Sequence, residues 1–173
     1  EKIANVTVVP PRFKLRFHTH DGDIELDAPG LRVDGKLSRP RGIFVDHFKS
    51  LQSMTSAIAK MTIPSPSTLH FRGGREAIDR DAYPEMDAFY ADLARVYNEE
   101  VRDLASAGCR YLQIDEVNIA FLCDPGIRER VRSIGEDPVS LLHRYAELIN
   151  RSIATRSADM AVCIHLCRGN FGA

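Results

Sequence analysis

Residues 109–117 read CRYLQIDEV, and this stretch is the predicted strand around which the rest of the sequence is organised. It ends in two adjacent carboxylates. From Met86 to Ala107, apolar residues recur with the period of an α-helix, which predicts an amphipathic helix immediately before the strand. Gly108 stands where a glycine commonly ends a helix.

The same alternation continues on both sides of this strand. Helical spacing over residues 44–55 is followed by KMTI at 60–63, a short buried strand that stops at Pro64. A further helix is predicted from about 140 to 153, and MAVCIHLC at 160–167 is the last strand. This pattern is typical of parallel βαβ units, in which functional residues gather at the carboxyl ends of the strands. We therefore predict an α/β fold with parallel strands near 60–63, 110–115 and 161–167.

The first 43 residues have a different, β-rich pattern. Four short stretches alternate or carry β-branched residues and are predicted strands: 5–9, 13–17, 24–26 and 31–37. The Asp-Gly pair within residues 20–23 suits the positive φ angles of a hairpin turn. We predict a small antiparallel β meander over residues 1–43, followed by the α/β part over residues 44–173.

The composition argues against several classes of function. The chain has 173 residues, enough for one domain with a core, and 44% of them are apolar. Its formal net charge of −1 gives no support to binding of nucleic acid or a membrane surface. No apolar run reaches the ~18 residues of a transmembrane helix, and the first residues lack a signal-peptide pattern. The four cysteines follow no secreted disulfide pattern, so we expect free thiols and a cytoplasmic protein.

A histidine and two cysteines alternate along the last predicted strand. Residues two apart on a strand share a face, so Cys163, His165 and Cys167 point the same way. Imidazole and thiolate are zinc ligands, but the two cysteines lie roughly 13 Å apart on an extended strand, too far to hold one ion. His165 and Cys167, nearest to the strand end, are the better pair. The alternative is that the cysteines are small buried apolar residues and that His165 belongs to the core.

Two carboxylates, Asp115 and Glu116, end the central strand. Adjacent strand residues point to opposite faces, so we do not expect them to act as one carboxylate pair. One of them could hold a cationic substrate group such as an amine. The alternative is a surface ion pair or a cap for the following loop.

Two loops carry further polar groups. Arg72-Gly73-Gly74-Arg75 could hold an anion, with His70 lining the same opening, or could be a solvated loop. Arg168-Gly169-Asn170 follows the last strand, and we expect it to serve a tight turn and a helix cap. The aromatic residues of the long helix are expected in the core.

Three stretches in this order, KMTIPSPSTLHFRGGR, CRYLQIDEVNIAFLCDP and HLCRGNF, resemble the cobalamin-independent methionine synthase family. The short, single-domain branch described as methionine synthase II-like is the most similar. The resemblance implies a TIM-type (βα) barrel. It also implies a zinc-dependent methyltransferase that moves a methyl group from a methylated folate to the thiol of homocysteine.

The resemblance assigns roles to individual residues. His165 and Cys167 match the first two zinc ligands of the family, and Asp115 matches the catalytic carboxylate that holds the amino group of the substrate. The resemblance also places Ser65 and Ser67 in the loop on the folate side of the mouth, where they are expected to bind substrate. His70 and Glu116 are expected to bind substrate from their positions in the sequence, and the resemblance does not assign them.

The sequence also departs from the family pattern. A later glutamate and a later cysteine that complete the zinc site are absent, as is the first strand, and three barrel strands are present where eight are expected. We therefore expect an internal part of a barrel, inactive alone, that forms a homo-oligomer through open sheet edges. Two alternatives remain: a related enzyme that alkylates another thiol such as coenzyme M, or a non-catalytic fragment.

Overall fold

A computed structural model describes residues 2–10, 14–19, 22–27 and 29–167. The strands are β1 (Ala4–Val9), β2 (Lys14–Thr19), β3 (Gly22–Asp27), β4 (Gly30–Ser38), β5 (Lys60–Pro64), β6 (Tyr111–Glu116) and β7 (Ala161–Leu166). The α-helices are α1 (Val45–Ser53), α2 (Thr68–Phe71), α3 (Met86–Ser106), α4 (Asn118–Phe121), α5 (Pro125–Ser133) and α6 (Pro138–Ser152), and a 3₁₀ turn, η1, covers Gly74–Ala77.

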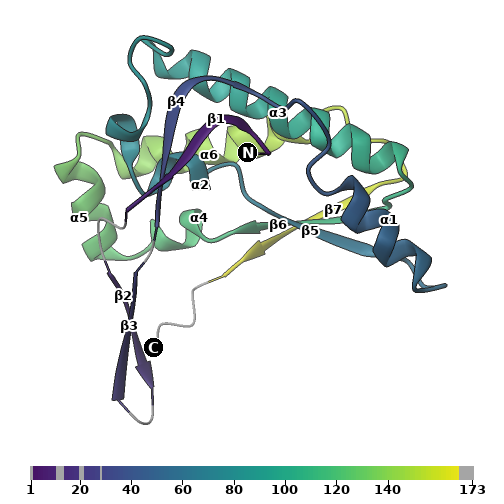
Figure 1. Ribbon diagram of the computed structural model, residues 1–173. Coiled ribbons are helices and arrows are strands. Elements are labelled where there is room, and N and C mark those ends of the chain that lie inside the picture. The colour runs from purple at the N-terminus through teal and green to yellow at the C-terminus, as the bar shows by residue number, and fades with distance from the viewer. Residues whose placement is uncertain (1, 11–13, 20–21, 28, 168–173) are drawn as a thin grey trace.

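Strands β5, β6 and β7 form a parallel sheet in that order, with β6 at the centre. This confirms the prediction of three parallel strands connected through helices. Helices α3 and α6 pack against each other and lie together on one side of the sheet (Figure 1). No helix among the described residues covers the other side, which we call the open face. Further strands beside β5 and β7 would be needed to close a barrel, so the barrel stays a prediction.

Residues of β6 alternate between the two faces of the sheet. Leu112 and Ile114 are fully buried in a cluster that includes Val101 and Leu104 of α3. Tyr111, on the opposite face, is 37% exposed. Because apolar side chains are buried on just one face of β6, its register is fixed. A slip of one residue would turn these side chains to the other face.

Specific residues end and begin the helices that cover the sheet. Helix α3 is followed by Gly108, whose φ of 99° is the left-handed conformation predicted for a glycine at this position. Asp124 and Asp137 cap α5 and α6, each accepting a hydrogen bond from a backbone N–H in the first turn. Each aspartate is followed by a proline at the first helical position. Helix α5 was not predicted from the sequence, although this Asp-Pro pair marks its start.

The N-terminal strands pair differently from the prediction. They are antiparallel, as predicted, but β1 pairs with β4 and β2 pairs with β3. The predicted meander, in which each strand pairs with the next, is therefore wrong. The strand order is that of one long hairpin interrupted in its middle, with β1 and β2 on one side and β3 and β4 on the other. In the sequence, two prolines, residues 10 and 11, separate β1 from β2, and a proline cannot donate a hydrogen bond to a strand ladder.

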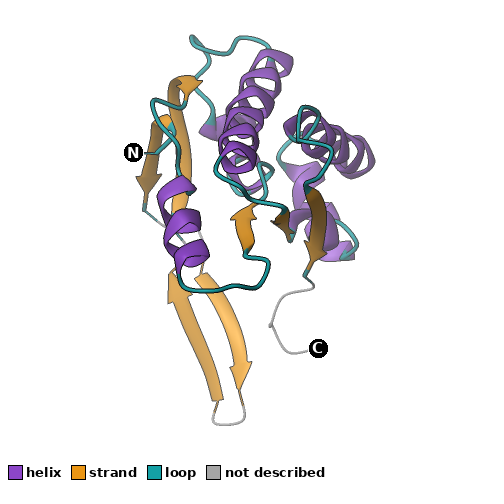
Figure 2. Ribbon diagram, turned by 90° about the vertical axis from the view of Figure 1, so that its right-hand side faces the viewer, coloured by secondary structure: helices purple, strands orange, loops and turns teal. Residues whose placement is uncertain are grey.

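The two halves of this hairpin lie in different surroundings. Val33 and Leu37 of β4 are buried in the same cluster as Phe89 and Leu93 of α3. Figure 2 shows that β2 and β3 instead extend away from the helices. Gly22 has a φ of 118°, as expected beside a hairpin turn, whereas His20 and Asp21 lie outside the described residues. The pair formed by β1 and β4 therefore shares a core with the helices. The domain division at residue 43 stays a prediction.

In the part of the chain that the structure describes, no helix has the length and apolar character needed to cross a membrane.

Candidate functional site

The pairing register brings the predicted site residues together on the open face. Asp115 of β6 is the register partner of both Pro64 of β5 and His165 of β7. Because residues in register on parallel strands share a face, Asp115 and His165 are neighbours at the carboxyl end of the sheet. Cys167 comes one residue after β7 ends. The described geometry thus gathers the assigned carboxylate and the two assigned zinc ligands at one edge.

The open face continues inward with a second row of polar residues. Gln113 is in register with Thr62 of β5 and Cys163 of β7. Its Nε2 atom donates a hydrogen bond of 2.6 Å to Oδ1 of Asp115. The Cys163 thiol lies 4.0 Å from the Oε1 atom of Gln113 and also raises the pKa of the Tyr111 hydroxyl through a hydrogen bond.

Glu116 lies on the opposite face from Asp115 and is completely buried. One carboxylate oxygen accepts hydrogen bonds from the hydroxyls of Ser65 and Ser67, the latter at 2.7 Å. The other oxygen accepts from the backbone N–H groups of Asn118 and Ile119 at 2.6 and 2.9 Å. Glu116 therefore joins the loop after β5 to the first turn of α4, and the two adjacent acids have separate environments.

Ser65 and Ser67 have no exposed surface. Besides its bond to Glu116, the Ser67 hydroxyl accepts a hydrogen bond of 2.7 Å from the side-chain amide of Asn118. These contacts give Ser65, Ser67 and Glu116 a structural role at the carboxyl ends of β5 and β6, and their contact with substrate stays a prediction. Sequence reasoning missed this network, although two serines after one strand and a glutamate at the end of the next strand were a signal for it.

Replacing Glu116 with glutamine is expected to destabilise the fold by about 1–3 kcal/mol, the usual cost when a buried hydrogen-bonded charge loses part of its partners. The amide offers one acceptor oxygen and turns an NH2 group toward donors. Urea unfolding provides the measurement. The variant should unfold at a lower urea concentration, while the dependence of the unfolding free energy on urea stays unchanged. The matched control is Glu129→Gln on the exposed side of α5, which should shift stability by less than about 0.5 kcal/mol. Equal midpoints for both variants would contradict the structural role.

His70 is buried in the core and does not line an opening. Its Nδ1 atom lies 2.8 Å from the Tyr145 hydroxyl, and its ring is tilted against that of Tyr90. Its Nε2 atom lies 3.6 Å from Oε1 of Glu136, and this proximity lowers the pKa of the Glu136 carboxyl. The prediction that His70 lines the mouth is therefore wrong for the described chain, because α2 turns the ring toward α3 and α6.

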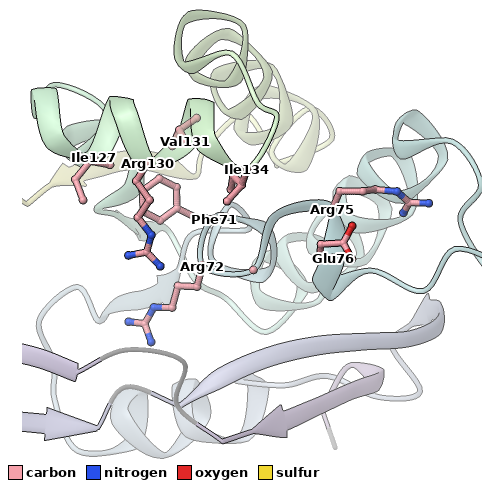
Figure 3. Close-up of a pocket in the computed structure, with 9 residues that line it drawn as sticks. Phe71, Arg72, Arg75, Glu76, Ile127, Arg130, Val131 and Ile134 are labelled. Carbon is pink, nitrogen blue, oxygen red and sulfur yellow. The ribbon is translucent and has the colours of Figure 1, made fainter.

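The Arg-Gly-Gly-Arg loop is only partly solvated. The Arg75 guanidinium donates to the carbonyls of Tyr83 and Ile78, at 2.6 and 3.4 Å. Arg72 donates to the carbonyl of Pro29 at 3.2 Å and, with Arg130, lies at a cavity of about 180 Å³ (Figure 3). Anion binding by this loop stays a prediction, and Arg168-Gly169-Asn170 lies outside the described residues.

The donor atoms at the edge of the open face suit zinc. All four cysteines are free thiols, and His165 and Cys167 supply one nitrogen and one sulfur donor. His165 is exposed and Cys167 is half-buried, so both are accessible to an ion. Within the described ranges, no cluster of three or more potential ligands is found. The two residues therefore fit as part of a zinc site, in which three or four ligands are usual.

Together, the fold and the site define a parallel α/β protein with polar residues collected at the carboxyl ends of its strands. Residues 23–173 match the family model of the cobalamin-independent synthase catalytic domain, and the chain belongs to this family. The resemblance inferred from the three sequence stretches is confirmed.

Individual relatives agree with this assignment. The chain is 32% identical over 172 residues to the uncharacterized protein YxjH of Bacillus subtilis, covering 99% of this chain and 44% of that protein. It is 29% identical over 140 residues to the 5-methyltetrahydropteroyltriglutamate–homocysteine methyltransferase of Klebsiella pneumoniae, covering 80% of this chain and 17% of that protein. A Listeria monocytogenes protein solved as a candidate vitamin-B12-independent methionine synthase superposes with a TM-score of 0.68 at 33% identity, covering 82% of this chain and 42% of that one. The chain thus spans less than half the length of these relatives.

Proposed function

We propose that this chain contributes part of the active site of a methyltransferase that moves a methyl group from a methylated folate to the thiol of homocysteine. The observation that carries the proposal is the placement of Asp115 beside His165, with Cys167 two residues further on. The Klebsiella relative is named for this reaction, and the family match covers all three residues.

Each residue has a role that follows from its chemistry. Asp115 accepts hydrogen bonds from the ammonium group of the amino acid and so orients the substrate on the open face. His165 and Cys167 would hold a zinc ion, which lowers the pKa of a bound thiol so that the thiolate can attack a methyl group. Mixed nitrogen and sulfur ligands favour zinc over magnesium or calcium. Free thiols suit a reducing compartment such as the cytoplasm.

We propose further that the three parallel strands are part of a TIM-type barrel, which typically needs ~250 residues. The remaining zinc ligands would then lie outside the described residues. The 173 residues alone should consequently bind zinc weakly and catalyse little methyl transfer.

The open edges of the sheet lead to a prediction about assembly. Ile164 and Leu166 of the edge strand β7 are 47% and 57% exposed, and an edge strand carries unpaired backbone groups. We expect the 173-residue chain to form a homodimer or higher oligomer through these edges. Light scattering at micromolar concentration checks this, and a stable monomer would contradict it.

The activity is tested on the full gene product that carries this sequence. Zinc-loaded protein is incubated with homocysteine and methyltetrahydropteroyltriglutamate, and methionine is measured by mass spectrometry before and after chelation. We expect methionine formation that is lost on chelation and restored by zinc. Absence of methionine with added zinc would overturn the proposal, and methylation of coenzyme M instead would identify another thiol as the substrate.

A further inference from the structure

Gln113 links two residues of the open face. Its Nε2 atom donates a 2.6 Å hydrogen bond to Oδ1 of Asp115, and its Oε1 atom lies 4.0 Å from the Cys163 sulfur. All three residues belong to the two rows of the open face nearest to its carboxyl edge. Gln113 is half-buried, so this hydrogen bond is partly screened from water.

The chemistry of the partners allows only one orientation of the Gln113 amide. An ionised carboxylate accepts hydrogen bonds and cannot donate them, so the NH2 group must face Asp115. The amide oxygen then faces Cys163, whose thiol is a weak donor. Thus both neighbours favour the same orientation of the Gln113 amide. Its NH2 group faces an acceptor, and its oxygen faces a weak donor.

The hydrogen bond also restricts the carboxylate of Asp115. One oxygen is held by Gln113, while no described residue donates a hydrogen bond to the second oxygen. A carboxylate that is fixed in advance loses less conformational freedom when it binds a cation than one that rotates freely. The fixed carboxylate leaves its second oxygen available for the ammonium group of a substrate.

We propose that Gln113 is a positioning residue that holds Asp115 ready for the amino group of the amino-acid substrate. This inference rests on the proposed function, because it presumes that Asp115 binds that amino group. Gln113 itself needs no contact with the substrate. Losing a hydrogen bond to a charged group should weaken binding of an amino thiol by roughly 10-fold.

The test compares two thiols that differ only in the amino group. Homocysteine and 4-sulfanylbutanoic acid are titrated calorimetrically into the zinc-loaded full gene product. Gln113→Met keeps the length of the side chain and removes the donor. Gln113→Asn keeps the amide but shortens it by one methylene, and it serves as an independent variant if the methionine variant does not fold. The matched control is Thr62→Val, which removes a hydroxyl from the same row of the open face.

We expect the wild type to prefer homocysteine, and both Gln113 variants to lose roughly 10-fold in affinity for homocysteine while binding of the des-amino thiol stays unchanged. Thr62→Val should leave both affinities unchanged. If the variants keep the wild-type preference, or lose affinity equally for both thiols, the positioning role is overturned while the proposed function stands. A wild type without preference for homocysteine would overturn both the role of Asp115 and the inference built on it.

Discussion

Replacing Cys167 with serine is expected to abolish zinc retention by the full gene product, and methyl transfer with it. Serine removes the thiolate that bonds to zinc, and its hydroxyl stays protonated at neutral pH. Mutating a residue that merely supports a ligand typically costs 10- to 100-fold in metal affinity, so loss of a ligand should cost more than about 100-fold. Zinc per chain is measured by mass spectrometry after gel filtration in the presence of a mild chelator.

Cys163→Ser is the matched control for this experiment. Cys163 lies on the same strand and shares a face with His165, but it is one row further from the carboxyl edge. The proposed site therefore predicts normal zinc content in this variant. If Cys167→Ser retained zinc, or if Cys163→Ser lost it, the ligand assignment would be wrong.

Replacing Asp115 with asparagine should lower kcat/KM for homocysteine by roughly 10- to 100-fold and leave the zinc content unchanged. The substitution keeps the shape of the side chain and removes the charge that attracts the substrate ammonium group. A hydrogen bond between charged groups contributes about 1.5–3 kcal/mol, which corresponds to this range. Steady-state kinetics with homocysteine as the varied substrate provide the measurement.

The neighbouring acid separates this effect from a general disturbance of the strand end. Glu116→Gln should reduce stability, but it should lower kcat/KM for homocysteine less than Asp115→Asn does, because Glu116 is buried on the opposite face. If Glu116→Gln lowered kcat/KM more than Asp115→Asn, the substrate would be held from the Glu116 side of the sheet, which would contradict the proposed role of Asp115. An Asp115→Asn variant with wild-type kinetics would remove Asp115 from the site.

Much of the sheet could be predicted from local patterns in the sequence. The helix from Met86 to Ala107 and the strands at 60–63, 110–115 and 161–167 were all predicted within a few residues, because their apolar residues repeat with regular periods. Parallel pairing then follows from the helices between the strands. This is why Asp115 and His165 could be expected at the same edge before their register was known.

The predictions that failed depended on long-range pairing. Antiparallel strands can pair with any strand that runs in the opposite direction, so local patterns did not distinguish a meander from the observed pairing of β1 with β4. Similarly, His70 follows a strand end and was placed at an opening, but its neighbour Tyr145 comes from a helix 75 residues away. Burial of Ser65 and Ser67 depends in the same way on Glu116 of the next strand.

The most direct test of the central claim is an anomalous diffraction experiment at the zinc edge on crystals of the full gene product with bound homocysteine. The proposed site predicts one peak at roughly 2.0–2.3 Å from a ring nitrogen of His165 and the sulfur of Cys167. It also predicts the substrate amino group within about 3.2 Å of the Asp115 carboxylate. A zinc peak away from His165 and Cys167, or an amino group bound elsewhere, would contradict the claim that these three residues form one site.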